Sequence, residues 1–177
     1  MKTNTYTLID DDLVKGCIEK DNHSRKLLYN RYSNELYTTA YHIVNDKDLS
    51  NDILHDSFIQ IFNDIKSLRN TAVLKFWMRK IVIHTSLKTL KKLRQVEYTD
   101  QPISDGIITW PDPMSGELLE KAMFNLPEGY RIVFSLIAIE GYKHQEVAKM
   151  LNISEGTSKS QLFHAKKHLR KMLSNGH

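Results

Sequence analysis

Basic side chains recur along one stretch of the sequence at the spacing of successive helical turns. Lys80, His84, Lys88 and Lys91 lie at i, i+4, i+8 and i+11, with Lys92 beside them. On an α-helix this spacing gives one cationic face about three turns long. Such a face can neutralise the phosphates of a nucleic-acid backbone. The alternative interpretation is an ordinary solvated helix face that binds nothing.

Two aromatic residues, Phe76 and Trp77, stand at the start of this basic stretch. Aromatic rings can stack on unpaired bases, but aromatic residues within an apolar run are more often buried. We therefore expect core packing to be the commoner role for this pair. Trp77 also marks the beginning of the candidate nucleic-acid track.

A second polar and basic pattern lies near the C-terminus, after a break at residues 152–154 where Ser154 can cap a helix. At 100° steps one face of that helix is polar and basic, and the opposite face is largely apolar. Hydroxyl and amide groups near the start of such a helix can hydrogen-bond base edges, and lysines further along can neutralise phosphates. The candidate DNA contacts are Ser154, Thr157, Lys159, Ser160, Gln161, His164, Lys167 and Lys171. A solvated helix face is again the alternative.

Apolar residues at helical spacing predict the elements that position these side chains. Helices are expected over about 13–18, 27–44, 49–65 and 73–93, then 118–123, 130–139, 147–151 and 155–173. No strand-like alternation occurs, so the predicted fold class is all-α. Asp10, Asp11 and Asp12 are expected at the start of the first helix, where the macrodipole favours them. The pair of helices around the break at 152–154 has the arrangement of a helix-turn-helix.

The chain divides into two basic blocks around an acidic connector. Residues 1–96 hold 16 Lys/Arg against 11 Asp/Glu, residues 97–128 hold 1 against 7, and residues 129–177 hold 8 against 3. Three of the four prolines fall in 97–116. We therefore predict a small helical domain over 1–96, a flexible acidic linker over 97–116 and a helix-turn-helix domain over 117–177. Two basic blocks suggest that the protein binds a polyanion at two places.

Composition excludes several other classes of protein. The chain has 177 residues, 41% of them hydrophobic, and a single cysteine, Cys17, which we expect in the core. No apolar run approaches the ~20 residues of a membrane span, and no signal peptide is evident, so a cytoplasmic protein is expected. His164 and His168 lack a third metal ligand, and no phosphate loop or nucleophile elbow occurs. We expect no metal, no cofactor, no small-molecule substrate and no enzymatic activity.

Three segments of the C-terminal block form a recognisable series: LPEGYRIVF at 126–134, GYKHQEVA at 141–148 and GTSKSQL at 156–162. In their order and spacing they resemble the promoter-binding domain of the extracytoplasmic-function (ECF) sigma factors. The resemblance implies that this domain reads the −35 promoter element. Ser158 and Gln161 depart from the Val and Arg that many members carry at these positions.

Two segments of the N-terminal block are similar to the other domain of the same family, namely DILHDSF at 52–58 and FWMRKI at 76–81. The first segment implies contact between RNA polymerase and Asp52, His55 and Asp56. The second implies opening and reading of the −10 element, with residues 68–72 in the position of the loop that captures an unstacked base. The implied −10 contacts are Arg69, Asn70, Thr71, Trp77, Lys80, His84, Lys88, Lys91 and Lys92. His55 and His84 depart from the usual Gln and Asn.

The sequence thus predicts a sigma factor that binds core RNA polymerase and promoter DNA. The resemblance also implies an anti-sigma partner, of the kind often tethered to the membrane. Two other hypotheses remain. A stand-alone helix-turn-helix regulator needs only the last ~50 residues to touch DNA. A helical interaction module would leave its basic faces merely solvated. The acid-free run 66–96 and the acidic segment 46–56 favour the sigma factor.

Overall fold

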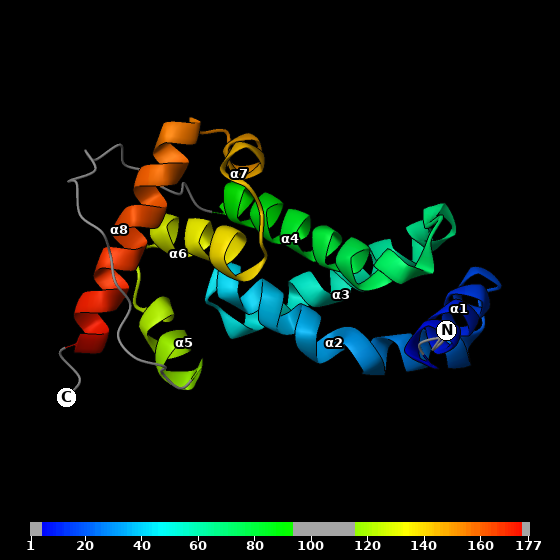
Figure 1. Cartoon of the computed structure of the whole chain (residues 1–177). Coiled ribbons are helices and arrows are strands. Elements are labelled where there is room, and N and C mark those ends of the chain that lie inside the picture. Colours follow the sequence, from blue (N-terminus) through cyan, green and yellow to red (C-terminus); the bar gives the residue numbers. More distant parts are fainter. Residues whose placement is uncertain (1–4, 94–115, 175–177) are drawn as a thin grey trace. The chain divides into compact units, whose positions relative to one another are not determined.

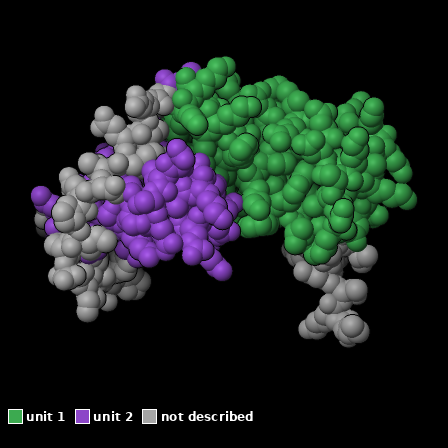
Figure 2. All heavy atoms as spheres, turned by 90° about the horizontal axis from the view of Figure 1, so that it is seen from above, with its two compact units in different colours: residues 1–92 green, residues 93–177 purple. Residues whose placement is uncertain are grey.

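The computed structural model describes residues 5–93 and 116–174, and every regular element in them is helical. The chain forms two compact units, residues 1–92 and 93–177 (Figure 2). The all-α prediction of two helical domains is confirmed. The predicted linker 97–116 lies outside the described residues, except Gly116, where α5 begins.

The first unit contains four α-helices: α1 (Thr5–Ile18), α2 (Asn22–Val44), α3 (Lys47–Asp64) and α4 (Leu74–Leu93). Two short helices, η1 (Ile65–Ser67) and η2 (Thr71–Val73), connect α3 to α4. α2 and α3 lie side by side, and α1 packs against the start of α2 and against η1 and η2 (Figure 1). The core side chains exposed by no more than 1% include Leu28, Leu36, Ile43, Ile53, Ile61, Leu74, Met78, Ile83 and Leu90.

Short polar side chains set the bounds of α2 and α3. The Asp21 carboxylate accepts the Ser24 N–H at 2.8 Å, and the Asp46 carboxylate accepts the Leu49 N–H at 2.9 Å, so each aspartate caps a helix N-terminus. Between α2 and α3, Asn45 adopts a left-handed conformation with φ 51°. Asn is one of the few residues that tolerates it. This turn reverses the chain within three residues and holds α3 against α2.

The expected position of Asp10, Asp11 and Asp12 at a helix start is wrong. α1 begins at Thr5, so these three residues lie in its middle, away from the N-terminal dipole. Two of them have tertiary partners instead: Asp10 bonds to α2 and Asp11 bonds to η2. Cys17 is buried with 1% exposure, as predicted.

The second unit contains α5 (Gly116–Phe124), α6 (Glu128–Phe134), η3 (Ser135–Ile139), α7 (His144–Leu151) and α8 (Glu155–Ser174). η3 is a π-helical continuation of α6, and Gly141 ends it with φ 77°, a conformation that glycine adopts without strain. In the core of the second unit, α5, α6 and α8 pack together through Met123, Leu126, Tyr130, Phe134 and Leu169. No helix in 5–93 or 116–174 is long and apolar enough to span a membrane.

Candidate nucleic-acid interface

The basic residues of α4 form an exposed stripe, as their spacing predicts. Lys80, His84, Lys88, Lys91 and Lys92 are all exposed, whereas the opposite faces of α4 bury Met78, Val82, Ile83, Ser86 and Leu90. Within the described residues none of the five forms an ion pair. Their charge is therefore available to an external polyanion.

Phe76 corrects the expectation of core packing. Its side chain is 52% exposed, and the Lys80 ammonium lies 5.6 Å from its ring centroid. Trp77, the next residue, is half-buried. Because residues 76, 80 and 84 lie on successive turns of one face, an exposed ring continues the cationic stripe. An aromatic ring next to cations offers both stacking and charge to a nucleic acid.

The predicted base-capturing loop, 68–72, directly precedes α4 and includes the start of η2. Arg69 and Asn70 are exposed, and the Asn70 side chain accepts the Ala72 N–H at 2.9 Å. Thr71 is half-buried, and its hydroxyl donates a hydrogen bond to the Asp11 carboxylate on α1. The fold thus brings the loop and Trp77 to one end of α4, from which the stripe runs toward the other end.

Two further cations of α4 are held by an acid that sequence reasoning missed. Glu35 on α2 pairs with Lys75 at 2.8 Å and also accepts a hydrogen bond from Arg79. Burial alone would raise the pKa of the Glu35 carboxyl, but the hydrogen bond from Lys75 and the charge of Arg79 outweigh it and hold the pKa below its ordinary value. Lys75 and Arg79 therefore fasten α4 to α2, in contrast with the unpaired stripe.

The candidate polymerase contacts lie on a different helix, α3. Asp52, His55 and Asp56 are all exposed, and Ile59, one turn further, is 50% exposed. Ile53, Leu54 and Phe58 on the opposite side are buried in the unit's core. An acidic surface with an exposed apolar side chain suits a protein partner with a basic, partly apolar surface.

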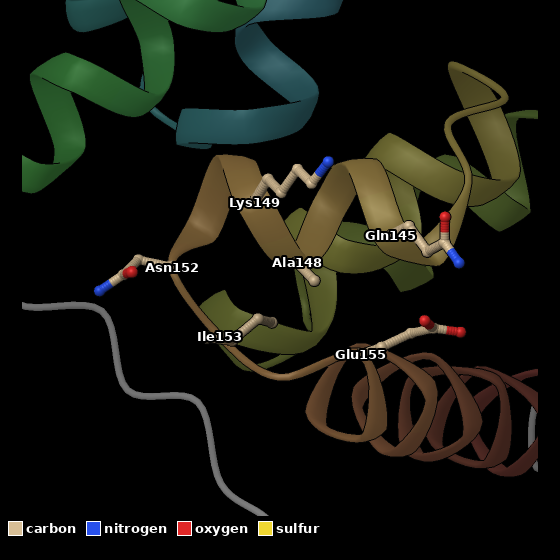
Figure 3. A pocket seen from close by; sticks show the side chains of 6 residues that line it. All are labelled: Gln145, Ala148, Lys149, Asn152, Ile153 and Glu155. Carbon is tan, nitrogen blue, oxygen red and sulfur yellow. The ribbon is translucent and has the colours of Figure 1, made fainter.

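The helix-turn-helix is built from α7, a turn at 152–154, and α8. Asn152 ends α7 in a left-handed conformation with φ 55°, and the exposed Ser154 hydroxyl accepts the Thr157 N–H at 2.8 Å. An open hollow of about 430 Å³ lies between α7 and α8. It is lined by polar and apolar residues of α7, the turn and the start of α8: Gln145, Ala148, Lys149, Asn152, Ile153 and Glu155 (Figure 3). Across the two helices, His144 Nδ1 is hydrogen-bonded to the buried Ser158 hydroxyl at 2.9 Å.

The predicted polar face of α8 divides into two groups. Lys159, Lys167 and Lys171 are exposed, and Lys159 pairs with Glu155 at 2.8 Å. The expectation that the neighbouring polar residues are exposed is wrong, because four of them are no more than 9% exposed: Thr157, Ser160, Gln161 and His164.

Local contacts account for part of this burial. The Ser160 hydroxyl donates to the Thr157 carbonyl at 3.0 Å within the helix, and the His164 ring stacks on Tyr130 at 5.9 Å between centroids. A helical wheel places residues around one axis and does not show which neighbours cover them. The DNA-contact roles of these four residues stay predictions.

The pKa values of two histidines in the second unit are lowered, and this predicts how its stability depends on pH. Burial, then the charge of Lys159, lowers the pKa of His144, with Lys166 adding to this and Glu155 opposing it. Burial, then the charges of His164, Lys171 and Lys167, lowers the pKa of His168.

Below about pH 6.5 the unfolded chain therefore binds protons that the folded unit resists. The thermal midpoint of the protein should fall as the pH drops from about 7.5 to 5.5, and less so in H144Q/H168Q. Circular dichroism melting at both pH values measures this, with the exposed pair His55→Gln and His84→Gln as the control. An equal fall in wild type and H144Q/H168Q would contradict it.

The comparisons with known proteins match both units. The model of sigma-70 region 2 matches residues 28–96, and that of sigma-70 region 4 matches residues 116–169. The chain belongs to the ECF group of the sigma-70 family. It is a sigma factor that binds core RNA polymerase and directs promoter-specific transcription initiation, as the sequence predicts.

Curated relatives span nearly the whole chain. The ECF RNA polymerase sigma-E factor of Haemophilus influenzae is 24% identical, with 95% of each chain covered. The ECF RNA polymerase sigma factor SigM of Bacillus subtilis is 25% identical, covering 84% of this chain and 94% of the relative.

Solved structures share the fold of this sigma factor. CnrH, in complex with the cytosolic domain of CnrY, has a TM-score of 0.55 and 17% identity, covering 96% of this chain and 99% of that one. The sigma factor RpoE of Bartonella quintana, in complex with the anti-sigma factor NepR, has a TM-score of 0.54 and 20% identity, covering 86% and 98%.

Proposed function

We propose that residues 1–96 of this sigma factor bind core RNA polymerase and recognise and melt the −10 element, and that residues 117–177 bind the −35 element. Residues 97–116 would join the two as a tether. This assignment rests on the presence of two features in one chain. They are a cationic stripe on α4, without ion pairs within the described residues, and a helix-turn-helix in the second unit. A stand-alone regulator needs only the second feature.

The −10 site comprises the loop and the stripe of the first unit. Arg69, Asn70 and Thr71 capture an unstacked base, Trp77 supports it, and the stripe from Lys80 to Lys92 neutralises the backbone of the separated strand. Binding energy drives melting, because stacking in a pocket and phosphate neutralisation offset a few kcal/mol of lost stacking and pairing per flipped base. Phe76, exposed beside Lys80, is a further candidate for stacking.

The −35 site comprises the start and the exposed side of α8. Lys159, Lys167 and Lys171 contact phosphates, and Ser154 lies at the positive end of the helix, where anions are stabilised. Thr157, Ser160, Gln161 and His164 read bases only if their side chains become exposed when DNA binds. The three lysines need no such change, because they are already exposed.

Three further features complete the proposal. Asp52, His55 and Asp56 on α3 dock on the polymerase. The protein acts in the cytoplasm without catalysing a reaction, since its work is binding. An anti-sigma protein, of the kind often tethered to the membrane, covers its polymerase-binding surfaces. Both solved structures are complexes, one with CnrY and one with the anti-sigma factor NepR.

Reconstitution with purified core enzyme tests the proposal. The protein should co-elute with core RNA polymerase, and the complex should start transcripts at discrete positions on fragmented genomic DNA, which core enzyme alone does not do. Sequencing of the transcript 5′ ends should reveal two shared upstream elements about one −10/−35 spacing apart. A protein that binds DNA but does not co-elute with core enzyme would support the stand-alone regulator instead.

A further inference from the structure

A hydrogen bond joins two segments of the first unit that are 60 residues apart in the sequence. The Thr71 hydroxyl at the start of η2 donates to the Asp11 carboxylate in the middle of α1. Thr71 belongs to the loop 68–72 assigned to the −10 element. Asp11 lies before residue 28, where the match to sigma-70 region 2 begins. α1 thus touches the predicted base-reading loop from outside the matched region.

α1 is itself firmly held, so Asp11 is a fixed point for the loop. The neighbouring carboxylate of Asp10 accepts the buried Tyr32 hydroxyl at 2.9 Å and pairs with Arg31 at 3.2 Å, both on α2. Leu13, Val14 and Cys17 are buried. Gly16 approaches Ser24 on α2 so closely that a Cβ at this position would overlap the Ser24 side chain.

The loop, in contrast, has few anchors of its own. Leu68 N–H bonds to the Ile65 carbonyl at 3.1 Å, and Val73 N–H bonds to the Asn70 carbonyl at 3.3 Å, so its backbone bonds are local. Arg69, Asn70 and Ala72 are exposed. The half-buried Thr71 side chain therefore connects the exposed part of the loop, residues 69–72, to a packed helix.

We propose that Asp11 is a positioning residue for −10 recognition: its bond to Thr71 holds the loop in the conformation that accepts the unstacked base. This proposal rests on the proposed function of the loop. A loop that is ordered before binding loses less conformational entropy when it captures a base. Removing the bond therefore lowers the affinity for −10 DNA and reduces the selectivity for the captured base. Asp11 touches no DNA in this scheme and acts only through Thr71.

The adjacent Asp12 provides a matched control. It is exposed like Asp11, carries the same charge, and makes no hydrogen bond or ion pair within the described residues. Removing either carboxylate changes the net charge of the protein equally, so a difference between D11A and D12A reports on the bond to Thr71 and not on net charge. On the loop, T71V removes the hydroxyl at nearly constant shape.

The experiment uses holoenzyme assembled with each full-length variant. The probe is a fork-junction DNA that wild-type holoenzyme selects from a pool randomised over the single-stranded −10 positions. D11A and T71V should bind this probe about three- to tenfold more weakly than wild type and select a less defined sequence, whereas D12A should resemble wild type. The double variant D11A/T71V should be no weaker than T71V, because Asp11 acts only through the Thr71 hydroxyl. Affinity for core enzyme should be unchanged throughout.

Hydrogen exchange of the free protein gives a second readout. Amides of residues 70–73 should exchange faster in D11A than in D12A, with α2 and α3 unaltered. Equal probe affinity and equal loop exchange in D11A and D12A would overturn the positioning role while leaving the proposed function intact. Failure of wild-type holoenzyme to select any −10 sequence would overturn the proposed function, and the positioning role with it.

Discussion

Replacing Asp52 and Asp56 by lysine should weaken binding of core RNA polymerase by about 100-fold, the scale expected when two interfacial charges are reversed. Both carboxylates are exposed on α3, and neither is ion-paired within the described residues, so the substitution removes no internal contact. Reversal converts attraction to a basic partner surface into repulsion. A titration of labelled core enzyme with the wild-type and D52K/D56K proteins measures the change.

The matched control reverses Glu19 and Asp64, which are also exposed and belong to the same unit. E19K/D64K changes the net charge by the same amount but lies away from the turn of α3 that carries residues 52–56. Its affinity for core enzyme should stay within about twofold of wild type, since isolated surface charges contribute little. Equal weakening by the two double variants would mean that overall charge, and not the surface around residues 52–56, governs the interaction.

Features that depend on local spacing could be predicted from the sequence. The stripe on α4 is exposed and the turn between α7 and α8 lies at 152–154, because helical periodicity and Asn or Ser at helix ends act within a few residues. Cys17 is buried for the same reason, as part of an apolar stripe. The two-domain helical fold followed from these elements and from the proline-containing acidic segment.

Features that depend on contacts between distant segments could not be predicted from the sequence. The Thr71 hydroxyl donates to Asp11 and the Arg79 guanidinium donates to Glu35, and no local sequence pattern indicates that these helices lie together. For Asp10–Asp12 the preference of acidic residues for helix N-termini predicted the wrong helix start. Acidic side chains in the middle of a helix can instead bond to residues of other helices, as Asp10 and Asp11 do. On α8, side-chain periodicity correctly placed the lysines outward but could not show that Gln161 is covered completely, with 0% exposure.

The stripe on α4 should govern how promoter binding depends on salt. Replacing Lys80, Lys88 and Lys91 by glutamine should weaken holoenzyme binding to its selected fork-junction DNA by about 100-fold near 0.1 M salt and reduce the slope of log K against log salt by about 2 to 3 units. Each lysine that neutralises a phosphate releases a counterion, so the slope counts the contacts directly. Glutamine keeps a long side chain with good helix propensity, and the three residues are exposed, so α4 should remain folded.

Lys15, Lys26 and Lys47 supply the charge-matched control, because they are exposed lysines of the same unit on α1, α2 and α3. K15Q/K26Q/K47Q lowers the net charge by the same three units, yet its salt slope should stay within about half a unit of wild type, since long-range attraction is screened within about 10 Å at this salt. Core-enzyme affinity should be the same for both triple variants. If the two slopes fell equally, the cations of α4 would act only through net charge, and the stripe would be the solvated helix face that its spacing equally allows.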